Sequence, residues 1–152
     1  NQINKLEKKY NTIISNFSIH NIFKISNGFY NFMNQLNIVS NEKSKLYISI
    51  IDLPDCEDIH LEDGSYIKHI KNEINYCNEL KSVIKCWYKT YYSFRHIKPI
   101  KEPKIDLIEF IKLMSNYGWK FNKEFTYNKT FKLKGNWLNL MNSIKRLEFI
   151  KL

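Results

Sequence analysis

Alanine is absent from this sequence, and glycine, proline and arginine are scarce, with four, three and two residues respectively. Lysine, isoleucine and asparagine are abundant in their place, a bias that indicates an AT-rich genome. The formal net charge of +9 comes almost entirely from lysine, so it reflects this bias as well as any acidic partner. Because recognition of phosphate and guanine usually relies on arginine forks, two arginines argue against a dedicated nucleic-acid reader.

Long apolar runs and paired cysteines are also missing. No stretch approaches the ~20 apolar residues of a transmembrane helix. Because the chain opens on Asn1 rather than methionine, we expect an upstream signal or anchor to be missing. Cys56, Cys77 and Cys86 lack the CxxC spacing of a zinc site. Two alternatives remain for them: three buried thiols, or one disulfide with one free thiol.

The residues that are present suit one folded domain. The chain has 152 residues, 43% of them hydrophobic and 15% aromatic, which is enough to bury a core without metal or disulfide support. We expect an N-terminal amphipathic helix in residues 1–20, with coiled-coil character, and a single α+β domain in residues 21–152.

The first segment has apolar residues at a spacing of three and four. Ile3, Leu6, Tyr10 and Ile13 form a narrow stripe, which predicts a helix over residues 2–17 with a nearly coiled-coil seam. These four side chains are the candidate partner-binding surface. The alternative is that the stripe packs on its own domain.

Strand and helix patterns alternate through the middle of the chain. The isoleucine-rich segment 45–52 predicts a buried strand, and an acidic loop follows it over residues 52–63. Apolar residues at helical spacing then predict a long helix from about Ser65 to Tyr92. This helix ends before the prolines of a basic linker, because proline cannot continue it.

The second half of the chain has clearer secondary-structure patterns. Asp106 lies three residues before Glu109, which is the spacing of a capping box and predicts a helix that stops at Gly118. Alternating apolar residues over 119–133 predict a hairpin of two strands. A further helix then begins near Gly135 and leads to a short closing strand.

Two stretches have similar patterns: FKISNGFYNFMNQL, which begins at Phe23, and FKLKGNWLNLMNSI, which begins at Phe131. Each combines a strand, a tight turn and an amphipathic helix with apolar residues at matching positions. Two βαβ units of this kind make the ferredoxin-like split βαβ fold. The predicted fold class is therefore α+β, a ferredoxin-like βαβ duplication with a long inserted helix and an N-terminal amphipathic helix.

The C-terminal third contains a strand ending in glycine, a large residue, a helix with leucine and isoleucine at three-and-four spacing, and a final strand: Leu133, Gly135, Trp137, Leu140, Ile144, Leu147 and Ile150. With the leading helix, this element resembles the periplasmic part of PilO and GspM proteins, and the resemblance covers residues 105–152. Those proteins are inner-membrane assembly components of type IV pili, type II secretion and DNA-uptake machinery. The resemblance implies a non-enzymatic assembly protein on the periplasmic side of a bacterial inner membrane, paired with a copy of itself or a related component.

Residues with catalytic or metal-binding chemistry form no known motif. Six carboxylates of the acidic loop lie near Cys56 and His60 without EF-hand spacing, which favours a solvated loop over a calcium site: Asp52, Asp55, Glu57, Asp58, Glu62 and Asp63. The other histidines accompany no nucleophile motif, and no glycine-rich phosphate loop is present. We therefore expect no catalytic residues, no metal and no cofactor.

The basic segment 85–104 supports an alternative function. It interleaves aromatic residues with cationic side chains, a composition that stacks bases and follows phosphates. The cations, which are candidate polyanion contacts, are Lys85, Lys89, Arg95, Lys98, Lys101 and Lys104. The alternative is a small, cytoplasmic nucleic-acid-binding module. A third interpretation is a eukaryotic parasite protein in which codon bias alone produces these patterns.

Overall fold

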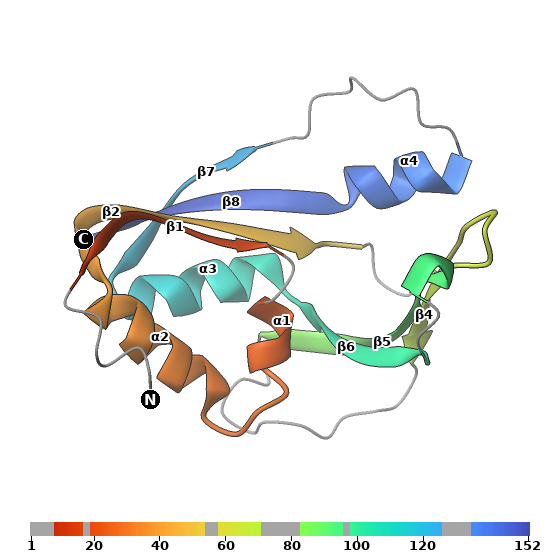
Figure 1. The fold of residues 1–152 in the computed structure, drawn as a ribbon, viewed down its shortest axis with the longest axis horizontal. Coiled ribbons are helices and arrows are strands. Elements are labelled where there is room, and N and C mark those ends of the chain that lie inside the picture. Colours follow the sequence, from red (N-terminus) through yellow and green to blue (C-terminus); the bar gives the residue numbers. More distant parts are fainter. Residues whose placement is uncertain (1–7, 17–18, 54–57, 71–82, 96–97, 126–134) are drawn as a thin grey trace.

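The chain is described by a computed structural model over residues 8–16, 19–53, 58–70, 83–95, 98–125 and 135–152 (Figure 1). Within these ranges the strands form two four-stranded sheets. Sheet A has the order β1-β2-β8-β7: β1 Tyr10–Asn16, β2 Ser40–Ile51, β8 Ile144–Lys151 and β7 Trp119–Phe125. Sheet B has the order β3-β4-β5-β6: β3 Ile59–His60, β4 Tyr66–Ile70, β5 Ile84–Tyr91 and β6 Ile100–Ile105.

Sheet A is a mixed sheet. β1 and β2 run parallel, with Ile13 beside Leu46, and the chain between them forms α1 (Ile19–Ile22) and α2 (Gly28–Ile38). β8 lies between β2 and β7 and is antiparallel to both. A parallel pair joined through helices, followed by antiparallel strands in the same sheet, is common in α/β proteins.

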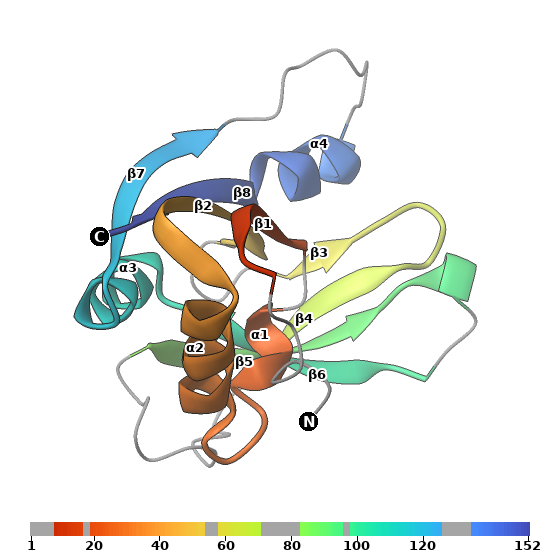
Figure 2. The same cartoon turned by 60° about the vertical axis from the view of Figure 1, so that its left-hand side comes forward.

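Sheet B is antiparallel throughout and is inserted between β2 and α3 (Leu107–Asn116). Its four strands follow one another in chain order, so each pairs with its sequence neighbours. Figure 2 shows this sheet beside the carboxyl ends of β1 and β2, with α1 between the two sheets. The insertion therefore places a second layer of side chains opposite the ends of the parallel strands.

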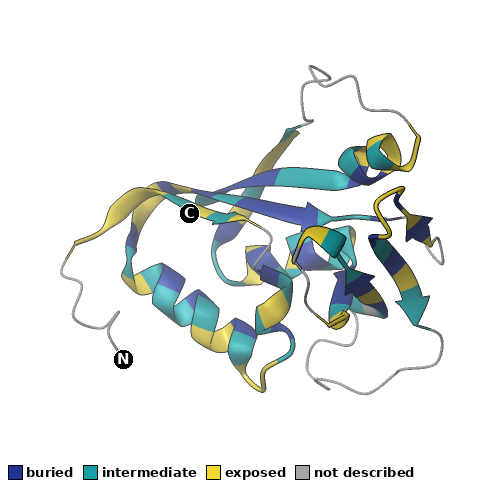
Figure 3. Cartoon of the chain, turned by 45° about the vertical axis from the view of Figure 1, so that its right-hand side comes forward, coloured by how far each residue is buried: buried dark blue, intermediate teal, exposed yellow. Residues whose placement is uncertain are grey.

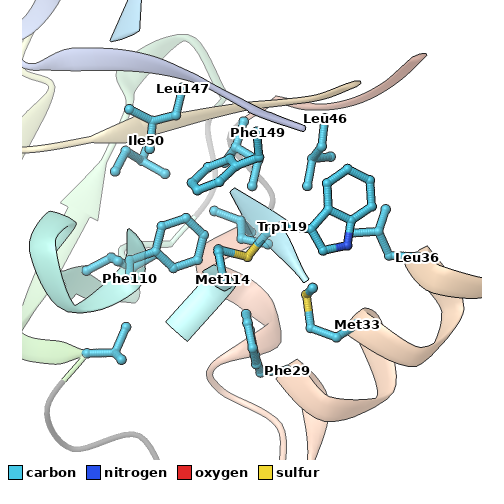
Figure 4. Close-up of a cluster of buried hydrophobic side chains, with 14 of the residues drawn as sticks. Phe29, Met33, Leu36, Leu46, Ile50, Phe110, Met114, Trp119, Leu147 and Phe149 are labelled. Atoms are coloured by element: carbon cyan, nitrogen blue, oxygen red, sulfur yellow. The ribbon is translucent and has the colours of Figure 1, made fainter. Parts of the chain in front are cut away.

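Helices α2 and α3 cover one face of sheet A (Figure 1). Their buried side chains meet those of the sheet in the main hydrophobic core (Figure 4): Phe29, Met33, Leu36, Leu46, Phe110, Met114, Trp119 and Phe149. Burying one such side chain stabilises a fold by about 1.5–3 kcal/mol. This core therefore fixes sheet A, and with it the strand ends that face sheet B.

Asp106 caps α3, as the sequence predicts. Its Oδ1 accepts a hydrogen bond from the backbone N–H of Glu109 at 3.0 Å. We expect Asp106→Ala to lower the free energy of unfolding by about 1 kcal/mol in urea denaturation, because α3 loses this cap. Asp106→Asn is the matched control, since its side-chain oxygen preserves the cap. Equal losses in both variants would contradict the capping role.

Several other predicted elements are present. The strand predicted over residues 45–52 lies in β2, and the helix predicted before Gly118 is α3. Gly118 has a φ of 81°, the left-handed conformation that ends helices. β7 is the first strand of the predicted hairpin, whereas its second strand would lie outside the described residues. The helix predicted near Gly135 is α4 (Gly135–Asn142).

Two predicted helices are wrong over the part of the chain that the structure describes. Residues 10–16 of the expected N-terminal helix form strand β1. The long helix expected from Ser65 to Tyr92 contains β4 near one end and β5 near the other, and residues 71–82 lie outside the described ranges. Both segments are rich in β-branched and aromatic residues, which suit paired strands. Pairing with neighbouring strands overrides the helical spacing there.

The ferredoxin-like duplication is also wrong. Phe23, which opens the first similar stretch, lies in a turn between α1 and α2 instead of a strand. Ile144 and Leu147, expected on the second helix, lie in β8. The similar apolar patterns reflect burial alone, because Phe23 packs fully into the main core without belonging to a strand.

Candidate functional site

A pocket lies where the carboxyl ends of β1 and β2 meet sheet B. It is lined by residues from α1, the end of β2, and strands β4 to β6: His20, Ile50, Ile51, Ile67, Tyr88, Thr90, Glu102, Pro103 and Ile105. Its solvent-sized space is about 30 Å³, which accommodates a water molecule or two, or the reacting end of a ligand. In open α/β sheets, ligands bind outside the carboxyl ends of the strands, so this is the position expected of a functional site.

Three polar side chains form a network in this largely apolar pocket. His20 Nε2 lies 3.1 Å from Glu102 Oε1, and the Thr90 hydroxyl donates to Glu102 Oε2 at 3.2 Å. The side chains of His20 and Glu102 are only 14% and 16% exposed. Glu102 therefore has a partner on each oxygen and little contact with solvent.

The electrostatics of the pocket favour an ionised Glu102. Burial opposes ionisation. The hydrogen bond from His20, the positive charge that this ring carries when it is protonated, the attraction of Lys24 and the Thr90 hydroxyl together outweigh it. The pKa of Glu102 consequently lies below its ordinary value of 4.5. Burial lowers the pKa of Lys24, although the attraction of Glu102 acts against this.

The ionised carboxylate also determines how His20 is protonated. A carboxylate can only accept hydrogen bonds, so His20 Nε2 carries a proton. In the neutral ring, Nδ1 is then the nitrogen that can accept a proton or a hydrogen bond. A histidine oriented by a carboxylate is the arrangement of a general base with its positioning group.

A second acidic side chain lies at the same end of sheet A. Asp52 follows β2 directly, and its backbone N–H donates to the carbonyl of Ser143 at 2.7 Å. Burial raises the pKa of Asp52, and the attraction of Lys104 and Lys145 only partly offsets this effect. The carboxyl end of β2 thus carries a half-buried acid close to the pocket.

The candidate partner-binding residues do not share one exposed face where the structure describes them. Tyr10 begins β1 and is 38% exposed, whereas Ile13 is partly buried against the main core. Ile3 and Leu6 lie outside the described residues, so their role stays a prediction.

The six cations of the basic segment lie on or next to β5, η3 (Ser93–Arg95) and β6. Lys89, Lys98 and Lys101 are exposed, whereas Lys104 is only 5% exposed and faces the other side of β6. Of Lys85 and Arg95 the structure describes the backbone alone. The structure therefore divides this set between two faces of sheet B, and its role as a polyanion contact stays a prediction.

The acidic loop lies only partly within the described residues, because 54–57 are outside them. Among the residues that are described, no three histidine, cysteine, aspartate or glutamate side chains are placed to hold a metal ion. Asp63 instead accepts hydrogen bonds from the hydroxyls of Ser65 and Ser93 at 3.0 and 2.6 Å. These bonds join the loop to η3.

Sequence reasoning missed the pair of His20 and Glu102. The two residues are 82 positions apart, and neither lies in a recognisable motif. Glu102 occurs between Pro99 and Pro103, in a segment for which the sequence predicts a basic linker. Only the pairing of β5 with β6, which places Glu102 beside Tyr88, brings it into the pocket.

Comparison with known proteins gives matches at the level of structure alone. No protein-family model matches the sequence, and no curated protein sequence matches it. The fold is similar to an S-adenosylmethionine-dependent methyltransferase described as putative from Listeria monocytogenes, with a TM-score of 0.59, 11% identity, and coverage of 99% of this chain and 66% of that one. It is also similar to the glycopeptide N-methyltransferase MtfA complexed with S-adenosyl-L-homocysteine, with a TM-score of 0.58, 9% identity, and coverage of 97% and 56%.

The chain therefore shares its fold with solved structures of methyltransferases. A third similar structure is the 1,6-didemethyltoxoflavin-N1-methyltransferase of Burkholderia thailandensis, with a TM-score of 0.54, 7% identity, and coverage of 98% of this chain and 48% of that one. The chain thus spans between about half and two-thirds of the length of these methyltransferases. The mixed sheet A, with its parallel pair and antiparallel β8, is the part that suits a Rossmann-like fold.

These similarities correct the expectations drawn from the sequence. The resemblance to PilO and GspM proteins is wrong, and so is the non-enzymatic assembly function that it implied, because the similar solved structures are methyltransferases. The same finding overturns the inner-membrane, periplasmic location. No helix among the described residues is long and apolar enough to cross a membrane. The alternative of a small nucleic-acid-binding module gains no support from the comparisons.

Proposed function

We propose that the chain forms the acceptor-binding part of an S-adenosylmethionine-dependent methyltransferase. The single observation that carries the proposal is the His20–Glu102 pair in a pocket at the carboxyl ends of a parallel strand pair. The fold supports it, since the similar solved structures are methyltransferases and two of them are N-methyltransferases.

The pocket itself does not fit the methyl donor, which would bind elsewhere on the protein. The sequence has no glycine from β1 to Gly28 or from β2 to Gly64, so no glycine-rich turn follows either parallel strand. The pocket of about 30 Å³ is also far too small for a nucleoside. We therefore assign this pocket to the methyl acceptor alone.

The pocket residues have different roles in binding the methyl acceptor and taking up its proton. His20 Nδ1 receives a proton that the acceptor loses, or a hydrogen bond from it, while Glu102 fixes the orientation of the ring. The aliphatic lining, which includes Ile50, Ile67 and Ile105, excludes water and lowers the local polarity. Such a site suits an acceptor whose reacting end is small and carries a hydrogen-bond donor.

The test is methyl transfer from tritiated S-adenosylmethionine to a panel of amines and nitrogen heterocycles. We expect His20→Asn to lower the turnover of an accepted substrate by about 10²–10⁴-fold, because a general base contributes this much. Binding of S-adenosylhomocysteine, measured by calorimetry, should stay unchanged in that variant. Lys112→Gln, an exposed change on α3, is the control and should keep full turnover.

Two outcomes would overturn the proposal. A protein that neither binds S-adenosylhomocysteine nor transfers methyl groups is not part of such an enzyme. A protein that transfers methyl groups equally well with His20→Asn has its acceptor elsewhere, and the pocket would then be only a packing defect between the two sheets.

A further inference from the structure

Three lysines lie in register across sheet B. Lys68 on β4 is directly opposite Lys89 on β5, and Lys89 is directly opposite Lys101 on β6. All three side chains are exposed. Figure 3 colours exposed positions yellow along the ribbon, including parts of the strands at the right of the view. We call this row the lysine ladder. Adjacent strands are ~4.8 Å apart, so the ladder crosses roughly 10 Å of the sheet.

The ladder lies on the face of sheet B opposite the pocket. Lys89 falls between Tyr88 and Thr90, and Lys101 precedes Glu102, and these three neighbours line the pocket. Side chains alternate between the two faces of a strand, so the lysines point away from it. The ladder is thus a surface separate from the proposed acceptor site.

A row of like charges is unfavourable in an isolated sheet. Like charges directly opposite one another on adjacent strands destabilise the pairing. Among the described residues, no carboxylate forms an ion pair with Lys68 or Lys89. The direct pairing of Lys68 with Lys89 therefore costs stability unless a negatively charged ligand lies across these two strands.

Aromatic rings border the ladder on one side. Tyr66 is directly opposite Tyr91, with ring centroids 5.6 Å apart and planes at 29°, and the Lys68 ammonium lies 5.2 Å from the Tyr66 ring centroid. Phe94 on η3, three residues after Tyr91, is 63% exposed. The hydrogen bond from the Ser93 hydroxyl to Asp63 holds η3 against the neighbouring loop. Rings beside cations match both the bases and the phosphates of single-stranded nucleic acid.

We propose that this face of sheet B binds single-stranded nucleic acid, with the lysine ladder contacting consecutive phosphates and the Tyr66–Tyr91 pair stacking on a base. The charge complementarity and the flat aromatic surface favour this ligand over an acidic peptide, which offers no rings to stack. The site goes beyond the proposed methyl transfer and does not depend on it, since binding is measured without a methyl donor.

The test measures binding of a fluorescein-labelled 20-nucleotide oligothymidylate by anisotropy over a range of salt concentrations. We expect the triple variant Lys68→Gln/Lys89→Gln/Lys101→Gln to weaken binding about tenfold or more at low salt. The slope of log affinity against log salt should fall by about 2, because each lost phosphate contact removes ~0.7. The control is Lys45→Gln/Lys112→Gln/Lys120→Gln, which removes the same charge from exposed lysines elsewhere and should change affinity much less.

A second pair of variants tests the stacking. Tyr66→Leu should weaken binding about tenfold with little change in the salt slope. Tyr30→Leu, which removes a 54% exposed tyrosine from α2, should have no effect. Thermal unfolding verifies that each variant is folded. Equal losses of oligothymidylate affinity in the two triple lysine variants would overturn the proposal. So would competition by polyglutamate of matched charge that is as strong as competition by unlabelled oligothymidylate.

Discussion

Replacing Trp119 with alanine is expected to lower the free energy of unfolding by about 3–5 kcal/mol, the range for a large aromatic side chain removed from a core. The side chain is 0% exposed and lies on β7, where α2, α3 and sheet A meet (Figure 4). Its Nε1–H also donates to Asn37 Oδ1 at 3.0 Å, so the variant loses a hydrogen bond as well as packing. Urea denaturation followed by circular dichroism measures the change.

Two other variants separate the contributions at Trp119. Trp119→Phe keeps most of the volume and loses the hydrogen bond, so we expect a loss nearer 1 kcal/mol. Ile108→Ala removes a 66% exposed side chain from α3 and should have little effect. If Trp119→Ala were no more destabilising than Ile108→Ala, the main core would not lie where the structure places it.

Replacing Glu102 with alanine is expected to lower the free energy of unfolding by about 1.5–3 kcal/mol at pH 7, because hydrogen bonds to charged groups contribute this much. His20 and Thr90 both lose their partner in the pocket. Since the pKa of Glu102 is lowered in the folded protein, its carboxylate stabilises the fold above the ordinary value of 4.5. This stabilisation is lost as the pH falls through the lowered folded value.

The pH profile distinguishes this cause from a simple packing defect. The difference in unfolding free energy between the natural chain and Glu102→Gln should be greatest near neutral pH and should shrink below about pH 4.5. Glu109→Gln is a suitable control, because its ion pair with Lys112 is on the surface of α3. A difference for Glu102→Gln that stays constant from pH 7 to pH 3 would contradict an ionised, hydrogen-bonded Glu102.

The parts of the fold that the sequence revealed are those with local signals. The cap at Asp106, the left-handed Gly118 and the isoleucine-rich strand of β2 each follow from a few neighbouring residues. These features depend on backbone geometry and hydrogen bonds within one or two turns, and such interactions are set by local sequence.

The parts that the sequence did not reveal depend on distant partners. Residues 10–16 have spacings compatible with a helix, but they form a strand because β2 offers a parallel partner about 30 residues further along the chain. The His20–Glu102 pair likewise exists only because α1 packs close to β6. Codon bias adds to the difficulty, since abundant isoleucine and lysine produce apparent amphipathic patterns and similar stretches without a shared structure.

The open edge of strand β1 affects how strongly this chain self-associates in solution. In the described part of the chain this strand pairs with β2 on one side only, and it carries Ile14 at 62% exposure. An open strand edge offers a row of backbone donors and acceptors that template the addition of another strand. At high concentration this polypeptide should therefore self-associate through β1, and a lysine or proline introduced on that edge should keep it monodisperse.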